Sequence, residues 1–241
     1  MLIVGLTGGI ATGKSTVSQY LEKTHGLTIV DADLIARQVV LPGTKGYNAI
    51  VKEFAEVTDI VNPEDSSLNR PALGKAVFGK PDRLKKLNSI VHPLVRREIV
   101  WQIFKAYIKM NQVVILDVPL LFEAGLDKIC GLTVTVSSTS SVQIERLLAR
   151  NPELSPEDAQ NRINSQMSND QRNFRADLVI DNSKDLPSLH QSIDSIVKEI
   201  KPCKLWYILD LFPPFAVLSA LFTFTLRALR DKFRTPREKS S

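Results

Sequence analysis

The chain has 241 residues and a formal net charge of +5, and this length suffices to bury a sizeable hydrophobic core. Residues 201–241 hold eight of the 31 basic and three of the 26 acidic residues, which leaves 23 of each before them; a neutral body argues against a nucleic-acid-binding surface. Cys130 and Cys203 lie far apart without a neighbouring Cys or His cluster, which argues against a disulfide framework and a zinc site and favours a reducing compartment.

The first predicted strand, Leu2–Thr7, leads into a glycine-rich turn and a predicted helix, Lys14–Lys23. The spacing Gly8-x-x-x-x-Gly13-Lys14-Ser15 fits the Walker A pattern in the strand–helix context that its mechanism requires, although a chance glycine-rich turn is the alternative. Lys14 would reach the β- and γ-phosphates of a nucleotide, and the Ser15 hydroxyl would bind Mg²⁺. The candidate phosphate ligands are Gly8, Gly9, Ile10, Ala11, Thr12, Gly13, Lys14, Ser15 and Thr16.

Two carboxylates follow the second predicted strand, Leu27–Asp31. We expect this strand to neighbour the P-loop strand in a parallel sheet, so Asp33 is expected to orient an acceptor hydroxyl or to accept its proton. For Asp31 the same role and an ordinary helix N-cap stay equally open.

About eighty residues separate the second and third strands, far more than an ordinary connection. Turn signals such as Leu41-Pro42-Gly43, together with a predicted helix at Pro93–Lys109, favour a helical insertion at about 40–110 over a loop. Insertions of this kind commonly build a substrate site near the carboxyl ends of the strands.

The third predicted strand, Val113–Asp117, is apolar and ends in a carboxylate that suits a Walker-B-like role near Mg²⁺. The block after it continues to Glu123. Within this block Leu121 and Phe122 stay open between core packing and a wall of the substrate site.

The remaining predicted elements are the strands Leu132–Val136 and Leu178–Asp181 and the helices Ser141–Ala149, Pro156–Met167 and Leu186–Ile200. Strands alternating with helices predict an α/β fold, with a parallel five-stranded P-loop sheet flanked by helices. An Arg-rich segment at about 145–175 is expected to form a lid. Arg146 and Arg150, one helical turn apart, are the first choices for phosphate contacts among its five arginines.

The C-terminal tail, residues 201–241, is largely apolar from Leu205 to Leu226, where Asp210 is the only charged residue, and basic from Arg227 to Lys239. The apolar part is long enough to span a bilayer. A single span, a monotopic hairpin or interfacial helix broken at Asp210 and Pro213-Pro214, and a helix packed on the body are the alternatives. The positive-inside tendency disfavours the span, so we expect attachment to membrane lipid through residues 205–239 without crossing.

Taken together, the motifs of residues 1–200 resemble the dephospho-CoA kinase family. The resemblance rests on the P-loop and on six further blocks: Asp31-Ala-Asp-Leu-Ile-Ala-Arg37, His92-Pro-Leu-Val95, Asp117-Val-Pro-Leu-Leu-Phe-Glu123, Gln143-x-x-Arg146-Leu-x-x-Arg150, Arg162-Ile-x-x-Gln166 and Ala176-Asp-Leu-Val-Ile-Asp-Asn182. It implies transfer of the γ-phosphate of ATP to the ribose 3′-hydroxyl of dephospho-CoA, giving coenzyme A and ADP with Mg²⁺.

The resemblance also implies roles for individual residues. Lys14, Asp33 and Arg146 would be catalytic, and Asn182 would lie near the adenine. Members of the family often carry Lys where this chain has Arg172, so Arg172 is left out of the predicted catalytic set. The implied dephospho-CoA ligands are Asp33, Arg37, His92, Asp117, Leu121 and Glu123.

The expected protein is thus a transferase with a kinase domain at 1–200 and a membrane-associating tail. The cytosolic face of the endoplasmic reticulum or of the outer mitochondrial membrane is the expected location, with a soluble cytoplasmic enzyme as the alternative; other enzymes of coenzyme A synthesis are conceivable partners. The alternative functions are a nucleoside or nucleoside-monophosphate kinase and a non-catalytic nucleotide-binding membrane tether.

Overall fold

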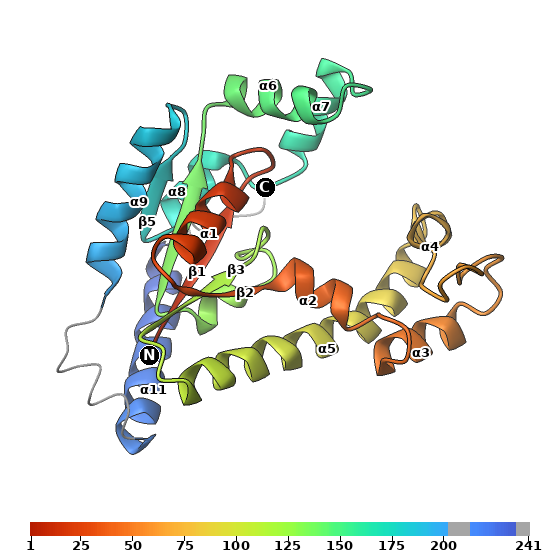
Figure 1. The fold of residues 1–241 in the computed structure, drawn as a ribbon, viewed down its shortest axis with the longest axis horizontal. Helices are drawn as coiled ribbons and strands as arrows, with labels where there is room; N and C mark the ends of the chain where they lie inside the picture. The colour runs from red at the N-terminus through yellow and green to blue at the C-terminus, as the bar shows by residue number, and fades with distance from the viewer. Residues whose placement is uncertain (202–212, 235–241) are drawn as a thin grey trace. The chain divides into compact units, whose positions relative to one another are not determined.

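The computed structural model describes residues 1–201 and 213–234 and contains one five-stranded sheet in the order β2-β3-β1-β4-β5 (Figure 1). The central strand β1 pairs in parallel with β3 and β4, and β4 pairs in parallel with β5. The predicted α/β fold with a five-stranded sheet is therefore confirmed. The expectation that the second strand neighbours the P-loop strand is wrong, because β3 lies between β2 and β1. The strands are β1 (Leu2–Gly8), β2 (Thr28–Asp31), β3 (Val113–Asp117), β4 (Leu132–Ser137) and β5 (Leu178–Asp181).

The chain divides into two compact units, residues 1–30 with 106–241 and residues 31–105. The second unit begins earlier than the predicted insertion at about 40–110, because it includes the helix that follows β2. The described helices are α1 (Lys14–Lys23), α2 (Ala32–Gln38), α3 (Lys45–Glu53), α4 (Arg70–Val77), α5 (Pro81–Ile108), the 3-10 helix η1 (Leu126–Ile129), α6 (Ser140–Arg150), α7 (Pro156–Asn164), α8 (Asn169–Arg175), α9 (Leu186–Ile200) and α11 (Pro213–Arg234).

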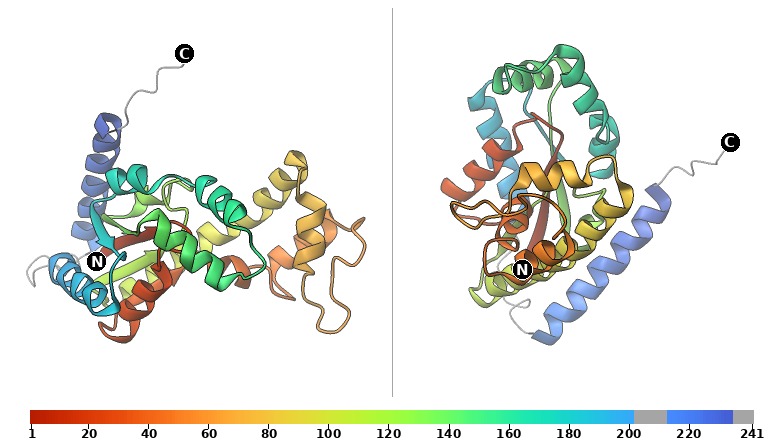
Figure 2. Two further views of the ribbon diagram at one scale, coloured as in Figure 1. Left: turned by 90° about the horizontal axis from the view of Figure 1, so that it is seen from above. Right: turned by 90° about the vertical axis from the view of Figure 1, so that its right-hand side faces the viewer.

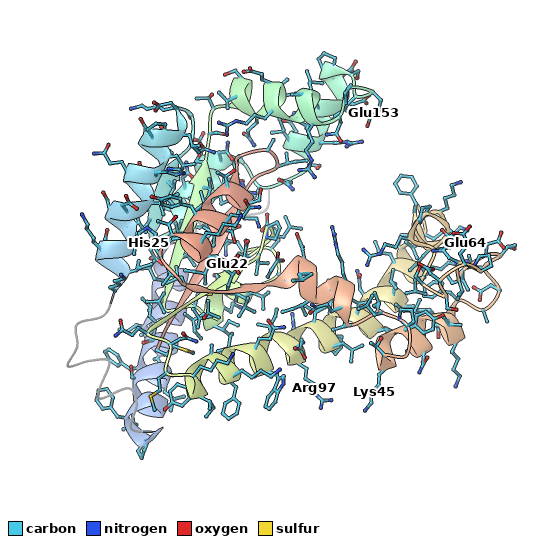
Figure 3. The ribbon with its side chains drawn as sticks, in the orientation of Figure 1. Glu22, His25, Lys45, Glu64, Arg97 and Glu153 are labelled. Atoms are coloured by element: carbon cyan, nitrogen blue, oxygen red, sulfur yellow. The ribbon has the colours of Figure 1, made fainter. Side chains whose placement is uncertain are left out.

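The main core of the first unit lies between the sheet and two helices, α1 and α9. Val4 and Leu6 of β1 face Val17 of α1 and Ile193 of α9, and all four side chains are almost completely buried. The His25 side chain, labelled in Figure 3, follows α1, and its Nε2 lies 2.8 Å from Oδ1 of Asp194 in α9. The helix α11, dark blue in Figure 2, lies against η1.

The second unit has its own core, built by α3, α4 and the first half of α5. Its buried residues are Ile50, Phe54, Ile60, Leu68 and Leu73, and Leu87, Ile90 and Val91 of α5 pack against them. These contacts require α5 to begin well before Pro93.

The predicted helix start at Pro93 is therefore wrong, because Pro93 lies inside a helix of 28 residues. Proline removes one backbone hydrogen bond and usually ends a helix. Here the apolar residues on its N-terminal side pack on α3 and α4, and this packing outweighs the local signal.

Among residues 1–201 and 213–234, no helix combines the length and the apolarity needed to cross a bilayer. The expected helix break at Asp210 and the apolar residues 205–212 lie outside the described residues.

Candidate active site

The P-loop forms a turn with a strained backbone between β1 and α1. Ala11 has φ 59° and Gly13 has φ 89°, both in the left-handed region that only glycine adopts without cost. The buried Thr12 hydroxyl donates to the Gly9 carbonyl at 2.9 Å and closes the turn from inside. The loop thus holds its shape through contacts of its own residues.

The N-terminus of α1 is built to receive an anion. Its N-cap is Gly13, none of the described side chains caps it, and its first turn carries no acidic residue. The first backbone N–H groups of a helix lack partners within the helix, and the helix dipole adds positive potential there. Ser15 and Thr16 are exposed in this first turn. These features fit a phosphate group.

Lys14 of the P-loop is held by the carboxylate at the end of β3. Its ammonium nitrogen lies 2.5 Å from Oδ1 of Asp117. The residue Asp117 is buried, with 3% of its surface exposed. The Thr7 hydroxyl donates to the Pro119 carbonyl at 2.7 Å, so the end of β1 and the segment after Asp117 are tied together. This places the predicted Asp117 beside the P-loop.

Asn182 contacts the P-loop from the end of β5. Its side-chain nitrogen donates to the Thr12 carbonyl at 2.8 Å, and the residue is 6% exposed. A Cβ atom on Gly13 would lie 2.1 Å from the same nitrogen, so Gly13 must be glycine for this contact to form. The predicted adenine contact of Asn182 stays a prediction, whereas its contact with the loop backbone is one that sequence reasoning missed.

Two arginines approach opposite ends of the P-loop. A Cβ atom on Gly13 would lie 3.7 Å from Nη1 of Arg146, and this nitrogen is buried without a hydrogen-bond partner among the described residues. A Cβ atom on Gly9 would lie 3.0 Å from Nη1 of Arg172, a residue left out of the prediction. Arg150, which was predicted together with Arg146, is exposed at the end of α6.

Side-chain amides from α6 and from the segment after α7 hold the peptide groups of Ile10. The Gln143 side-chain nitrogen donates to the Ile10 carbonyl at 2.6 Å, and the Ile10 N–H donates to Oε1 of Gln166 at 2.9 Å. The sequence motifs contain both glutamines, but their spacing gives no sign that they meet at the P-loop. A cavity of about 640 Å³ lies beside this contact, with Gly9, Gln143, Gln166 and Arg172 in its wall.

Leu121 and Glu123, the two predicted substrate residues in the block after β3, differ in their exposure to solvent. Leu121 is 0% exposed, and a Cβ atom on Gly5 would lie 2.7 Å from its side chain, so the structure favours core packing over a substrate wall. The Glu123 side chain is 30% exposed, and its carboxylate lies 3.8 Å from Arg172.

In the second unit, Asp31 is the N-cap of α2. Its Oδ1 accepts hydrogen bonds from the backbone N–H groups of Asp33 and Leu34 at 2.8 and 3.0 Å, so the structure shows the N-cap role of Asp31. Asp33 and Arg37 are exposed one turn apart on α2, so their side chains share one helix face. Their relation to the P-loop stays a prediction.

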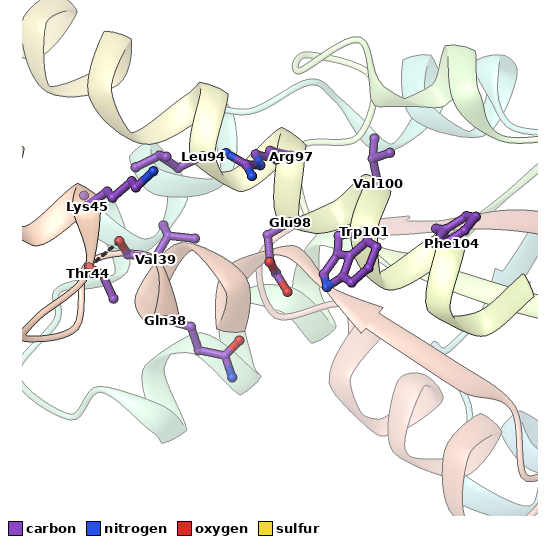
Figure 4. A pocket seen from close by; sticks show the side chains of 11 residues that line it. Gln38, Val39, Thr44, Lys45, Leu94, Arg97, Glu98, Val100, Trp101 and Phe104 are labelled. Carbon is purple, nitrogen blue, oxygen red and sulfur yellow. Dashed lines mark hydrogen bonds between the residues drawn. The ribbon is translucent and has the colours of Figure 1, made fainter. Parts of the chain in front are cut away.

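His92 is exposed in the middle of α5, not at a helix start as its position before Pro93 suggested. A second cavity, of about 840 Å³, lies between the end of α2, the start of α3 and the second half of α5 (Figure 4). Its wall includes Lys45, Arg97 and the stacked rings of Trp101 and Phe104.

Comparisons with known proteins show the family of the chain. The family model described as dephospho-CoA kinase matches residues 2–188. A dephospho-CoA kinase of Saccharomyces cerevisiae is 50% identical over 241 residues, which cover 100% of this chain and 99% of the relative. A dephospho-CoA kinase of Arabidopsis thaliana is 41% identical over 206 residues, 86% of this chain and 87% of the relative.

Among solved structures, a Thermus thermophilus protein has a TM-score of 0.70 at 30% identity and covers 83% of this chain and 98% of its own. A Campylobacter jejuni dephospho-CoA kinase has a TM-score of 0.58 at 24% identity and covers 83% and 97%; this likeness supports the fold. The chain therefore belongs to the dephospho-CoA kinase family, and it is an enzyme that phosphorylates dephospho-CoA to coenzyme A with ATP.

Proposed function

We propose that α1, Lys14 and Arg146 hold the phosphates of ATP while Asp33 activates the ribose 3′-hydroxyl of dephospho-CoA. The observation that carries the donor half is the uncapped N-terminus of α1, next to an arginine with an unpaired buried nitrogen. Charge-assisted hydrogen bonds from such groups stabilise the negative charge on a phosphoryl group in transfer.

The acceptor half rests on α2. Asp31 fixes the first turn of this helix through two hydrogen bonds, and Asp33 presents an exposed carboxylate from the same turn. In the proposed reaction the 3′-oxygen bonds to the γ-phosphorus as the bond from that phosphorus to ADP breaks, and the hydroxyl proton passes to Asp33. Arg37, His92, Asp117 and Glu123 are the proposed contacts to dephospho-CoA.

Mg²⁺ fits the oxygen ligands at the start of α1. Ser15 is exposed there, and the Asp117 carboxylate lies beside the loop through Lys14. Mg²⁺ prefers such hard oxygen ligands and is commonly held by one or two protein groups together with substrate phosphates. When bound, it would neutralise charge on the phosphates.

The Asp33→Asn variant tests the acceptor role. Asn keeps the size of the side chain but cannot take the proton, so we expect turnover of dephospho-CoA to fall by roughly 10²- to 10⁴-fold while the affinity for ATP stays within about twofold. Steady-state kinetics and calorimetric ATP binding measure the two quantities. Unchanged turnover would remove Asp33 from this role, and a parallel loss of ATP affinity would place it on the donor side.

We also propose that α11 attaches the enzyme to the cytosolic face of a membrane. Its apolar residues Leu218, Leu221, Phe222, Leu226 and Leu229 are 47% to 66% exposed, and their spacing places them along one stripe. Four basic residues follow within Arg227–Arg234. An apolar stripe with adjoining basic residues suits an interfacial helix on anionic lipid.

A further inference from the structure

The guanidinium of Arg172, in the last turn of α8, is buried without sufficient hydrogen-bond partners. The residue is 1% exposed, and its Nη1 donates a long hydrogen bond of 3.4 Å to Oδ1 of Asn169. Its Nη2 lies 3.8 Å from the Glu123 carboxylate, beyond hydrogen-bond distance. Among the described residues, neither Nε nor Nη2 has a hydrogen-bond partner.

A buried guanidinium with unpaired N–H groups destabilises the fold unless another group accepts hydrogen bonds from it. Burial lowers the pKa of Arg172, and Glu123 only partly opposes this effect. An unsatisfied buried donor on a charged group destabilises the fold by more than an unsatisfied neutral one. Buried polar groups left unpaired in this way usually have a functional explanation.

The position of Arg172 indicates what the missing partner is. A Cβ atom on Gly9 would lie 3.0 Å from Nη1, so the guanidinium lies against the first turn of the P-loop. Arg172 and Gly9 also share the wall of the cavity of about 640 Å³. An anion that binds to the P-loop in this cavity could therefore contact the Arg172 guanidinium.

A network of amides orients the guanidinium toward the loop. Asn169, which accepts from Arg172, donates to Oε1 of Gln143 at 2.7 Å and to the Ser138 carbonyl at 2.9 Å. Gln143 in turn donates to the Ile10 carbonyl of the P-loop. Arg172 is thus connected to the loop backbone through two side chains that fix its direction.

We propose that Arg172 is a second phosphate-binding arginine, whose Nε and Nη2 donate to the transferable phosphoryl group of ATP. The proposal rests on the donor half of the proposed function. The α- and β-phosphates of a P-loop nucleotide lie over the loop N–H groups and the helix start, the end that Gly13 and Arg146 occupy. Arg172 approaches the opposite end, at Gly9, and stabilises the charge of the phosphoryl group as it leaves ADP for the acceptor oxygen.

Calorimetric binding of two nucleotides tests this assignment without any acceptor. In the Arg172→Gln variant, we expect binding of the β,γ-imido analogue of ATP with Mg²⁺ to weaken by about tenfold or more, because two charge-assisted hydrogen bonds are lost. Binding of ADP should change by less than about twofold. Arg70→Gln, at an exposed arginine at the start of α4, is the matched control and should bind both nucleotides as the parent does.

Equal weakening for both nucleotides, or no change for either, would overturn the proposal. Because Arg172 is buried, thermal unfolding is recorded for each variant. If Arg172→Gln does not fold, Arg172→Met replaces it, because Met removes the charge but keeps a long unbranched side chain, and it should show the same selective loss of analogue affinity. Glu123→Gln tests the structural rival, in which Arg172 only holds Glu123. If Glu123→Gln, with Arg172 unchanged, shows the same selective loss of analogue affinity, Arg172 acts through Glu123 and the assignment to phosphate is wrong.

These outcomes separate the inference from the proposed function. Selective loss of the analogue in Arg172→Gln would stand even if Asp33 proved dispensable, because the assay contains no dephospho-CoA. Intact turnover in Arg172→Gln, measured on the same samples, would contradict a role in phosphoryl transfer.

Discussion

At the scale of single residues, the P-loop depends on the absence of two side chains. Gly13 combines a φ of 89° with an approach of Asn182 that leaves no room for a Cβ atom. Gly9 makes room for a different group, since a Cβ atom there would lie 3.0 to 3.2 Å from Arg172, Asn169 and Gln143. The two glycines therefore admit the amide of Asn182 at one end of the loop and the guanidinium of Arg172 at the other.

Gly9→Ala is expected to impair the donor site without unfolding the protein. The added methyl must push the polar network away from the loop, and overpacking of this kind typically costs about 1–3 kcal/mol. We expect the affinity for ATP to fall by roughly tenfold, measured by calorimetry.

The matched control for Gly9→Ala is Gly74→Ala. Gly74 lies in α4, and a Cβ atom there would meet nothing within 4 Å. This variant should bind ATP normally and gain stability, since alanine is the better helix former. Normal ATP binding in Gly9→Ala would show that the network does not act on the loop.

At the scale of elements, local signals predicted some helices well and others poorly. The helices at 14–23 and 186–200 begin and end where their patterns predict, because α1 follows a sequence motif and α9 has a continuous apolar face. The start of α5 was missed, because Pro93 is a strong local stop signal that packing on α3 and α4 overrides. Such packing is set by distant residues and leaves no mark near Pro93.

The helix α11 is the element whose proposed role is most open to direct measurement. We expect the protein to sediment with vesicles of phosphatidylcholine and phosphatidylserine. A Phe222→Asp, Leu226→Asp variant should bind them at least about tenfold more weakly, because it places charge on the apolar stripe. Kinase activity in solution should stay unchanged.

Phe78→Asp is the control for non-specific binding of exposed apolar side chains to lipid, since Phe78 is 85% exposed but lies outside α11. It should sediment with vesicles as the parent does. If the parent chain does not bind the vesicles, or if the α11 variant binds as strongly as the parent, the proposed attachment fails.

At the scale of the whole molecule, the sheet and the donor half of the site could be read from the sequence. Buried parallel strands appear as short apolar runs, and the P-loop is a contiguous motif, so neither depends on distant partners. The contacts of Arg172, Gln143 and Asn182 with the loop were not foreseen. They join residues more than 100 positions apart in the sequence, and residue spacing carries no information on such meetings.

The acceptor half was inferred from the resemblance to a family more than from residue patterns. Asp33 and Arg37 share a face of α2, but neither their spacing nor their exposure names the molecule that they bind. The identity of the acceptor entered through the family blocks and is supported by the relatives that carry the same activity in their names.

The most direct test of this account is a competition among acceptors with purified protein, ATP and Mg²⁺. We predict that kcat/KM for dephospho-CoA exceeds that for AMP, CMP and adenosine by at least about a hundredfold, because a site built to bind a substrate's polar groups rejects analogues that lack them. The product should carry its new phosphate on the ribose 3′-oxygen. Comparable turnover of any of the three nucleotide or nucleoside acceptors would contradict the account.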